Sequence, residues 1–132
     1  VYELGLPSLK TALCHSRDSI SLAVSSELEK NERVVVKPSF SRFASKTFIL
    51  KKGDPLPNEV EPNTIYPWIV QEAAHGPEYC SYSVAYKGKL LAHSVYSHEF
   101  TAGKGAGICF ENQVVPEIEA WVSKFVEKIG YT

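Results

Sequence analysis

Two apolar strand segments, residues 33–37 and 68–72, do most to constrain what this chain can fold into. The first is a β-branched run that ends on Lys37, and a proline then stops the strand and opens a short polar loop. Its continuous apolar character predicts a strand buried on both faces. The second segment ends in the carboxamide of Gln71 and the carboxylate of Glu72. Each strand therefore leads directly into polar side chains.

Helix signals frame these strands. Ser16 is a good N-cap residue, and a carboxylate two residues later favours the positive end of the helix dipole. Near the other end of the chain, Pro116 suits a first helical position and Gly130 suits the residue after a helix. Five prolines or glycines make 51–67 an irregular crossing.

In order, we expect an extended segment over 4–14, a helix from 16 to about 30, strands over 33–37, 47–50 and 68–72, a hairpin of 79–86 and 89–96, a mobile glycine loop over 100–107, and a helix over 116–130.

This order of elements predicts the α+β class. The strands are connected by hairpins and loops, and the helices are segregated from them, which is typical of an antiparallel sheet with helices packed on one side. A parallel sheet built of repeated strand–helix–strand units is not supported by the pattern.

Composition excludes several classes of function. The 132 residues carry a formal net charge of -1, which gives no support to a nucleic-acid surface. No apolar run approaches the roughly 20 residues of a membrane helix. The three cysteines are widely spaced, so we expect reduced, mostly buried thiols in a cytoplasmic protein and no metal site within this chain. The chain contains no methionine and begins at Val1, so we expect it to be part of a longer protein.

Lys37 is the first candidate for a binding role. A strand-end lysine can simply extend into solvent, but it can also contact flexible phosphates as a compact point charge. The loop that follows carries hydroxyls and a guanidinium that could fold over phosphates, from Ser39, Ser41 and Arg42. Lys104 lies among three glycines, where a plain surface loop and a phosphate- or substrate-covering loop both remain open, because no Walker motif is present.

The segments 34–38 and 69–79 together resemble the ATP-grasp superfamily, in particular ligases of the carbamoyl-phosphate-synthase-like and biotin-carboxylase-like kind. Residues 80–84 and 88–92, the segment 5–11 and the closing helix extend the resemblance over nearly the whole chain. The resemblance implies a partial ATP-grasp fold, with a small middle lobe over about 8–72 and the hinge and beginning of the C-terminal lobe over 73–132.

The resemblance also implies a chemistry. ATP-grasp ligases phosphorylate a small-molecule carboxylate with ATP, and an amine or another nucleophile then attacks the acyl phosphate. Carried over by position, Lys37 would contact the ATP phosphates and Glu78 the ribose hydroxyls, while Ser39, Ser41 and Arg42 would cover the phosphates. The hinge would meet adenine mainly through backbone groups of Gln71, Glu72, Ala73 and Ala74, and Lys104 would face phosphate or substrate. No catalytic residue is assigned.

The sequence departs from the family pattern in two respects. The family's Mg²⁺ ligands are expected beyond Thr132, and the N-terminal lobe that usually contributes another lysine and part of the acceptor site is absent from these residues. In addition, the phosphate-covering loop lacks glycine. We therefore expect this portion alone to be inactive. The alternatives are a degenerate ATP-grasp module with a nucleotide-binding, regulatory or scaffold role, and an unrelated α+β binding domain.

Overall fold

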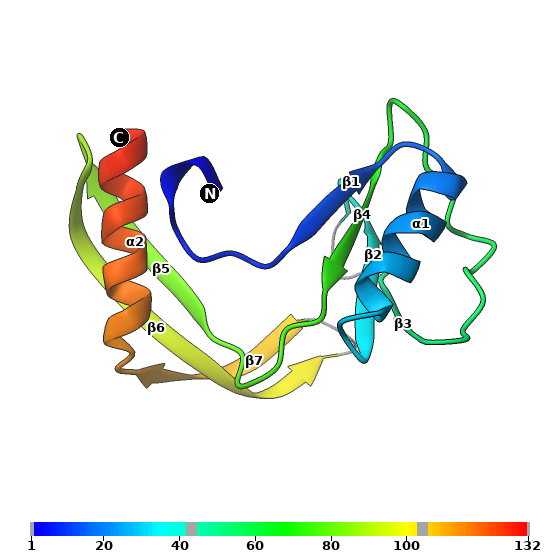
Figure 1. Cartoon of the computed structure of the whole chain (residues 1–132). Helices are drawn as coiled ribbons and strands as arrows, with labels where there is room; N and C mark the ends of the chain where they lie inside the picture. Colours follow the sequence, from blue (N-terminus) through cyan, green and yellow to red (C-terminus); the bar gives the residue numbers. More distant parts are fainter. Residues whose placement is uncertain (1, 42–44, 103–105, 132) are drawn as a thin grey trace. The chain divides into compact units, whose positions relative to one another are not determined.

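The structure is a computed structural model that describes residues 2–41, 45–102 and 106–131. The chain divides into two compact units. We call Leu9–His75 the four-stranded unit, and Val1–Ser8 with Gly76–Thr132 the three-stranded unit. The elements, drawn in Figure 1, are η1 (Tyr2–Leu4), β1 (Thr11–Cys14), α1 (Arg17–Leu28), β2 (Arg33–Pro38), β3 (Phe48–Lys51), β4 (Trp68–Glu72), β5 (Cys80–Tyr86), β6 (Lys89–Ala102), β7 (Ala106–Gln113) and α2 (Pro116–Ile129).

The four-stranded unit is an antiparallel sheet with the strand order β1-β4-β2-β3. Helix α1 contacts β1, β2 and β4 and lies along one face of this sheet (Figure 1). The core forms between them, where apolar side chains of alternate strand positions meet the helix. Its buried members are Cys14, Ile20, Val34, Val36, Leu50, Val60, Trp68 and Val70.

The expectation that β2 is buried on both faces is wrong. Val34 and Val36 are fully buried, whereas Arg33, Val35 and Lys37 between and beside them are only half-buried. The reason is that α1 covers one face, so alternate side chains of every strand point away from the core. We call the face away from α1 the open face. By alternation it carries Thr11, Leu13, Arg33, Val35, Lys37, Ile49, Lys51, Ile69 and Gln71.

Helix α1 begins as the sequence indicates. Ser16 is its N-cap, and the Ser16 hydroxyl accepts a hydrogen bond from the backbone N–H of Ser19 while the Ser19 hydroxyl accepts one from the N–H of Ser16. This reciprocal arrangement satisfies two backbone donors that the first turn leaves unpaired. The helix ends at Leu28, slightly before the expected end.

The irregular crossing between β3 and β4 is confirmed. Residues 52–67 contain neither helix nor strand, yet Val60 is fully buried in the core. The guanidinium of Arg17 donates hydrogen bonds to the carbonyl oxygens of Leu56 (3.0 Å), Pro57 (2.9 Å) and Val60 (2.7 Å). One side chain at the start of α1 therefore anchors the middle of this long segment.

The three-stranded unit is a second antiparallel sheet, with the strand order β5-β6-β7. Its hairpin turn at Lys87-Gly88 is confirmed, and both residues have positive φ. Helix α2 contacts β6, and Val95 and Val126 are buried in this unit. As expected, α2 begins at Pro116 and is closed by Gly130 in the left-handed conformation.

The N-terminal segment belongs to this second unit. The indole Nε1–H of Trp121 donates to the carbonyl oxygen of Pro7 at 3.0 Å, and the ammonium of Lys128 donates to that of Leu4 at 2.6 Å. Both donors lie on α2, so the helix holds the first residues of the chain through their backbone. The sequence pattern alone gave no sign of this connection.

The prediction of a loop over 100–107 is wrong for most of these residues. β6 continues to Ala102 and β7 begins at Ala106, while 103–105, with Lys104, lie outside the described residues. A β-carbon at Gly107 would come within 2.8 Å of the ring carbon Cγ of His98. Gly107 therefore leaves room for the side chain of His98 on the paired strand, whereas from the sequence it looked like part of a flexible loop.

The α+β class is confirmed, but the strands form two sheets, each with one helix, where we expected a single sheet. The expectation of mostly buried thiols is wrong as well, because Cys80 and Cys109 are exposed and only Cys14 is buried. Neither α1 nor α2 combines the length and the apolar character that crossing a bilayer requires.

Burial gives the four-stranded unit a pH dependence through Cys14. Burial raises the pKa of this thiol above its ordinary value of 9.0, although a hydrogen bond with Ser19 lowers it in part. The unfolded thiol ionises first, so the unfolded state binds fewer protons and the free energy of unfolding falls as the pH rises above 9. We expect a loss of at most about 1.4 kcal/mol per pH unit from this group.

Urea unfolding of the wild type and of Cys14→Ala between pH 7 and 10 measures this effect. The variant should be less stable at pH 7 but should lose less stability at alkaline pH. Parallel losses in the two proteins would contradict the assignment.

Candidate functional site

Three polar side chains from three strands form a connected row on the open face. The ammonium of Lys37 in β2 donates to Oε1 of Gln71 in β4 at 3.0 Å. The amide nitrogen Nε2 of Gln71 donates to Oγ1 of Thr11 in β1 at 2.8 Å, and the Thr11 hydroxyl donates to the carbonyl oxygen of Leu9 at 2.9 Å. We call Lys37, Gln71 and Thr11 the polar row.

The strand register brings this row together. β4 lies between β1 and β2, and Gln71 is directly opposite Thr11 on one side and Val35 on the other. Lys37 lies two residues beyond Val35 along β2, so its long side chain reaches Gln71 along the diagonal. Sequence order alone does not place a residue from position 11 beside one from position 71.

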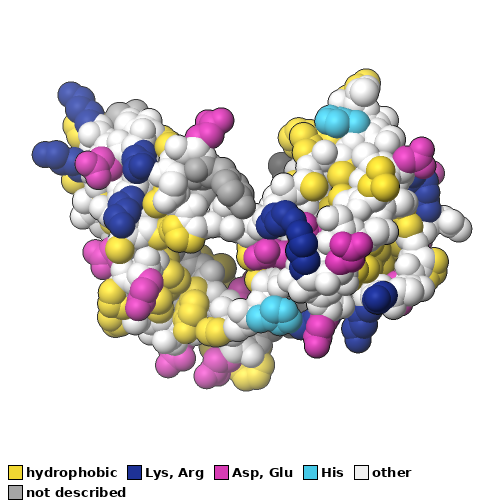
Figure 2. Space-filling view, viewed as in Figure 1, with side chains coloured by type: hydrophobic (Ala, Val, Ile, Leu, Met, Phe, Trp, Pro, Cys, Tyr) yellow, Lys and Arg dark blue, Asp and Glu magenta, His cyan; other side chains and the backbone are white. Residues whose placement is uncertain are grey.

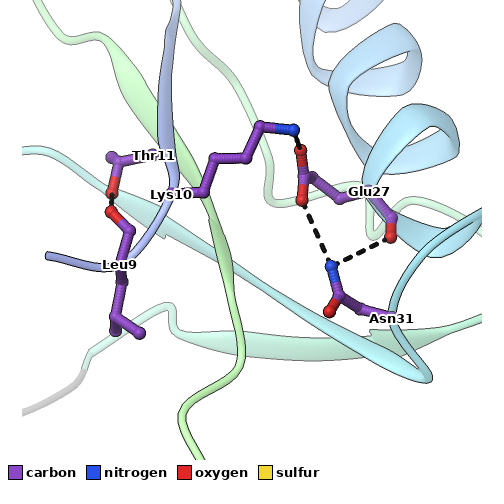
Figure 3. A network of polar contacts seen from close by, with 5 residues as sticks. All are labelled: Leu9, Lys10, Thr11, Glu27 and Asn31. Carbon is purple, nitrogen blue, oxygen red and sulfur yellow. Dashed lines mark hydrogen bonds and ion pairs between the residues drawn. The ribbon is translucent and has the colours of Figure 1, made fainter.

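Figure 3 shows that Lys10 and Thr11, at the start of β1, point to opposite sides. Thr11 points away from α1, while its neighbour Lys10 points toward the helix and forms an ion pair with Glu27, a buried carboxylate of α1. Asn31 donates to the other oxygen of that carboxylate at 3.2 Å. The ion pair ties α1 to the chain on one side, and the polar row lies on the other.

Among the strand positions assigned to the open face, every charged side chain is basic. The cations are Arg33, Lys37 and Lys51, and Arg33 lies directly opposite Lys51 in the register. Strand alternation places Glu72 on the α1 side, and within the described part of the chain no carboxylate forms an ion pair with these three cations. The view in Figure 2, taken from the α1 side, shows acidic and basic side chains side by side on that surface instead. Three uncompensated cations on one face attract anions.

Arg33 contributes a second polar contact at the end of the sheet. Its Nη2 is 3.2 Å from Nδ1 of His75, which follows β4. Because a guanidinium can only donate, Nδ1 is the acceptor in this contact. The segment after β4 is therefore connected to the start of β2 by a side chain of the open face.

The predicted hinge residues belong to the same unit as the polar row. The backbone N–H of Glu72 donates to the carbonyl oxygen of Lys10 at 3.2 Å, and its side chain is half-buried. Ala73 is half-buried and Ala74 exposed, and both lie just after β4. Glu78 is exposed in the segment before β5 and belongs to the three-stranded unit.

The predicted phosphate-covering loop is described only in part. The backbone N–H of Ser39 donates to the carbonyl oxygen of Pro67 at 3.0 Å, and its hydroxyl is buried without a partner among the described residues. Ser41 is exposed. Arg42 and Lys104 lie outside the described residues, so the structure does not place them.

Sequence reasoning missed Thr11, Arg33 and His75 as members of this region. Each is an ordinary polar residue whose partner lies far away in the sequence. The alternation of 11–14 could have indicated that Thr11 and Leu13 share a face. However, Pro7 lies earlier in the segment 4–14, and this segment was expected only to be extended.

Comparison with known proteins does not identify the chain. No protein-family model and no curated protein matches the sequence. In the part of the chain that the structure describes, no group of three or more His, Cys, Asp or Glu side chains is placed to hold a metal ion. The geometry of the open face and the sequence resemblance are therefore the two indications of function.

The Lys10–Glu27 ion pair gives a test of how α1 is held on the sheet. Lys10→Met should lower the free energy of unfolding by about 1–2 kcal/mol, because it leaves the buried Glu27 carboxylate with Asn31 as its remaining side-chain donor. The expected loss is smaller than for a fully buried ion pair, because Lys10 is half-exposed. Chemical denaturation measures the loss, and the exposed Lys30→Met is the matched control. Equal stability of the two variants would show that the ion pair contributes little.

Proposed function

We propose that the open face of the four-stranded unit binds the phosphates of ATP, and that this chain is the ATP-binding portion of an ATP-dependent carboxylate–amine ligase of the ATP-grasp superfamily. The observation that carries the proposal is the environment of Lys37. Its ammonium is hydrogen-bonded at a strand end to a neutral amide, which leaves the ammonium available to an anionic ligand. Arg33 and Lys51 add positive charge on the same face.

The remaining roles follow the sequence resemblance. Backbone groups of Gln71 to Ala74 would meet adenine, and Glu78 would accept hydrogen bonds from the ribose hydroxyls. Ser41 and Arg42, with the backbone of Ser39, would cover the phosphates, and Lys104 would face phosphate or substrate. The division into two α+β units supports the proposal, because the family has two such lobes.

The proposed reaction transfers the terminal phosphoryl group of ATP to a small carboxylate and releases ADP. An amine then displaces phosphate from the acyl phosphate. When bound, Mg²⁺ would neutralise charge on the phosphates. This chain would supply mainly positioning and charge stabilisation, and the protein would act in the cytoplasm. The sequence resemblance places the Mg²⁺ ligands outside the residues of this chain.

A second candidate is a degenerate module of the same fold that binds nucleotide without catalysis. The phosphate-covering loop favours it, because that loop lacks glycine and the Ser39 hydroxyl is turned into the protein. Binding of Mg·ATP without phosphate release in the intact protein, across a panel of carboxylates and amines, would select this candidate.

The Lys37 prediction tests the proposal most directly. Lys37→Met should weaken Mg·ATP binding about 10-fold or more, since a charge-assisted hydrogen bond contributes about 1.5–3 kcal/mol. The fold should be retained, because a half-buried strand-end charge adds little to the core. Calorimetric titration measures the affinity, with Lys52→Met as a control that removes an exposed lysine of the same unit. Equal affinities of the two variants would remove Lys37 from the site.

The ribose prediction concerns Glu78. Glu78→Ala should weaken the binding of ATP several-fold, by about 1 kcal/mol, but should hardly affect a triphosphate nucleotide that lacks both ribose hydroxyls. The same titration with both ligands measures the difference, and Glu117→Ala serves as an exposed carboxylate control. If Glu78→Ala weakened both ligands equally, the carboxylate would not act through the ribose.

A further inference from the structure

We propose that Thr11 is a positioning residue for Lys37 and acts through the side-chain amide of Gln71. This inference rests on the proposed function, because it concerns how the phosphate-binding lysine is held. It adds a specific role for the Gln71 side chain, where the sequence resemblance implied contact with adenine mainly through backbone groups.

The groups at the two ends of the polar row determine which side chains donate and which accept hydrogen bonds along it. At one end the Lys37 ammonium can only donate, so the atom of Gln71 that faces it must be the amide oxygen. At the other end the carbonyl oxygen of Leu9 can only accept, so the Thr11 hydroxyl uses its single hydrogen there. Thr11 therefore accepts from Gln71, and the group that faces it must be the amide NH₂.

This direction matters because a carboxamide has two nearly equivalent orientations. If the Gln71 amide were rotated by half a turn, its NH₂ group would face the Lys37 ammonium and two donors would oppose each other. Within the described residues, Thr11 is the only side chain hydrogen-bonded to the amide nitrogen of Gln71. The Thr11 hydroxyl thus selects the orientation that holds Lys37.

Holding Lys37 through the neutral amide oxygen of Gln71 does not neutralise the positive charge of its ammonium. A carboxylate at the same place would form an ion pair with the ammonium, whereas the amide oxygen only orients it. A flexible lysine loses conformational freedom when it binds a ligand, and a lysine already fixed on the sheet loses less. Removing the Thr11 hydroxyl should therefore weaken phosphate binding although Thr11 itself need not touch the ligand.

The experiment compares Thr11→Val and Thr11→Ser with the wild type, using the complete chain. Valine keeps the shape and the strand preference of threonine but removes the hydroxyl, and serine retains the hydroxyl. Thr64→Val makes the same chemical change in an exposed loop of the same unit and serves as the matched control. Circular dichroism and urea unfolding show that each variant folds.

Two measurements are made on each protein. The first is the hydrogen-exchange rate of the Gln71 side-chain amide by NMR, with the signals assigned by their loss in Gln71→Leu. The second is the dissociation constant for Mg·ATP by calorimetry. In Thr11→Val we expect faster amide exchange and about 3- to 10-fold weaker binding, while Thr11→Ser and Thr64→Val remain near the wild type.

The outcomes separate this inference from the proposed function. Unchanged amide exchange in Thr11→Val would overturn the inference, and so would faster exchange with an unchanged dissociation constant. A folded wild-type chain that does not bind Mg·ATP would overturn the proposed function and the nucleotide role of Thr11 with it. In that case the exchange rates would still decide whether Thr11 orients the Gln71 amide.

Discussion

Helix α1 lies on one face of the sheet β1-β4-β2-β3, and most features of the four-stranded unit depend on this packing. Because the helix covers a single face, Val34 and Val36 are buried while Val35 and Lys37 on the same strand are not. The same arrangement leaves Leu13 58% exposed and Ile49 59% exposed on the open face. One-sided packing therefore creates both the core and the surface that carries the polar row.

The two faces use charge in different ways. On the α1 side, the buried Glu27 carboxylate is paired with Lys10 and hydrogen-bonded to Asn31, so charge there serves to hold the helix. On the open face, Lys37 has an amide partner and Arg33 an imidazole partner, which orient these two cations without neutralising them. A sheet can thus be stabilised through one face while the other keeps a net positive charge for an anion.

Local signals predicted much of the fold. Ser16, Pro116 and Gly130 marked helix ends correctly, because caps depend on the backbone groups next to them. The hairpin turn at Lys87-Gly88 was also predictable, since its positive φ values favour glycine. These features need no knowledge of distant residues.

Features that depend on tertiary partners were not predictable. Gly107 looked like part of a loop because the proximity of the His98 side chain on the paired strand cannot be identified from spacing. The apolar run of β2 looked buried on both faces because the sequence does not show how many helices cover a sheet. For the candidate site, Lys37 and Gln71 were identified from their strand ends, but Thr11 joins them only through the strand order.

The anchoring of the β3–β4 crossing by Arg17 has a consequence for how this chain can be modified. The guanidinium fixes the backbone at Leu56, Pro57 and Val60, whereas the following residues Ile65 and Tyr66 are largely exposed. The crossing is therefore anchored in its middle, while residues 65 and 66 are more accessible. Exposed loop tips are where proteins accept inserted sequence and where proteases cut first. The region around 63–66 is accordingly the natural place to attach a probe without disturbing α1 or the open face.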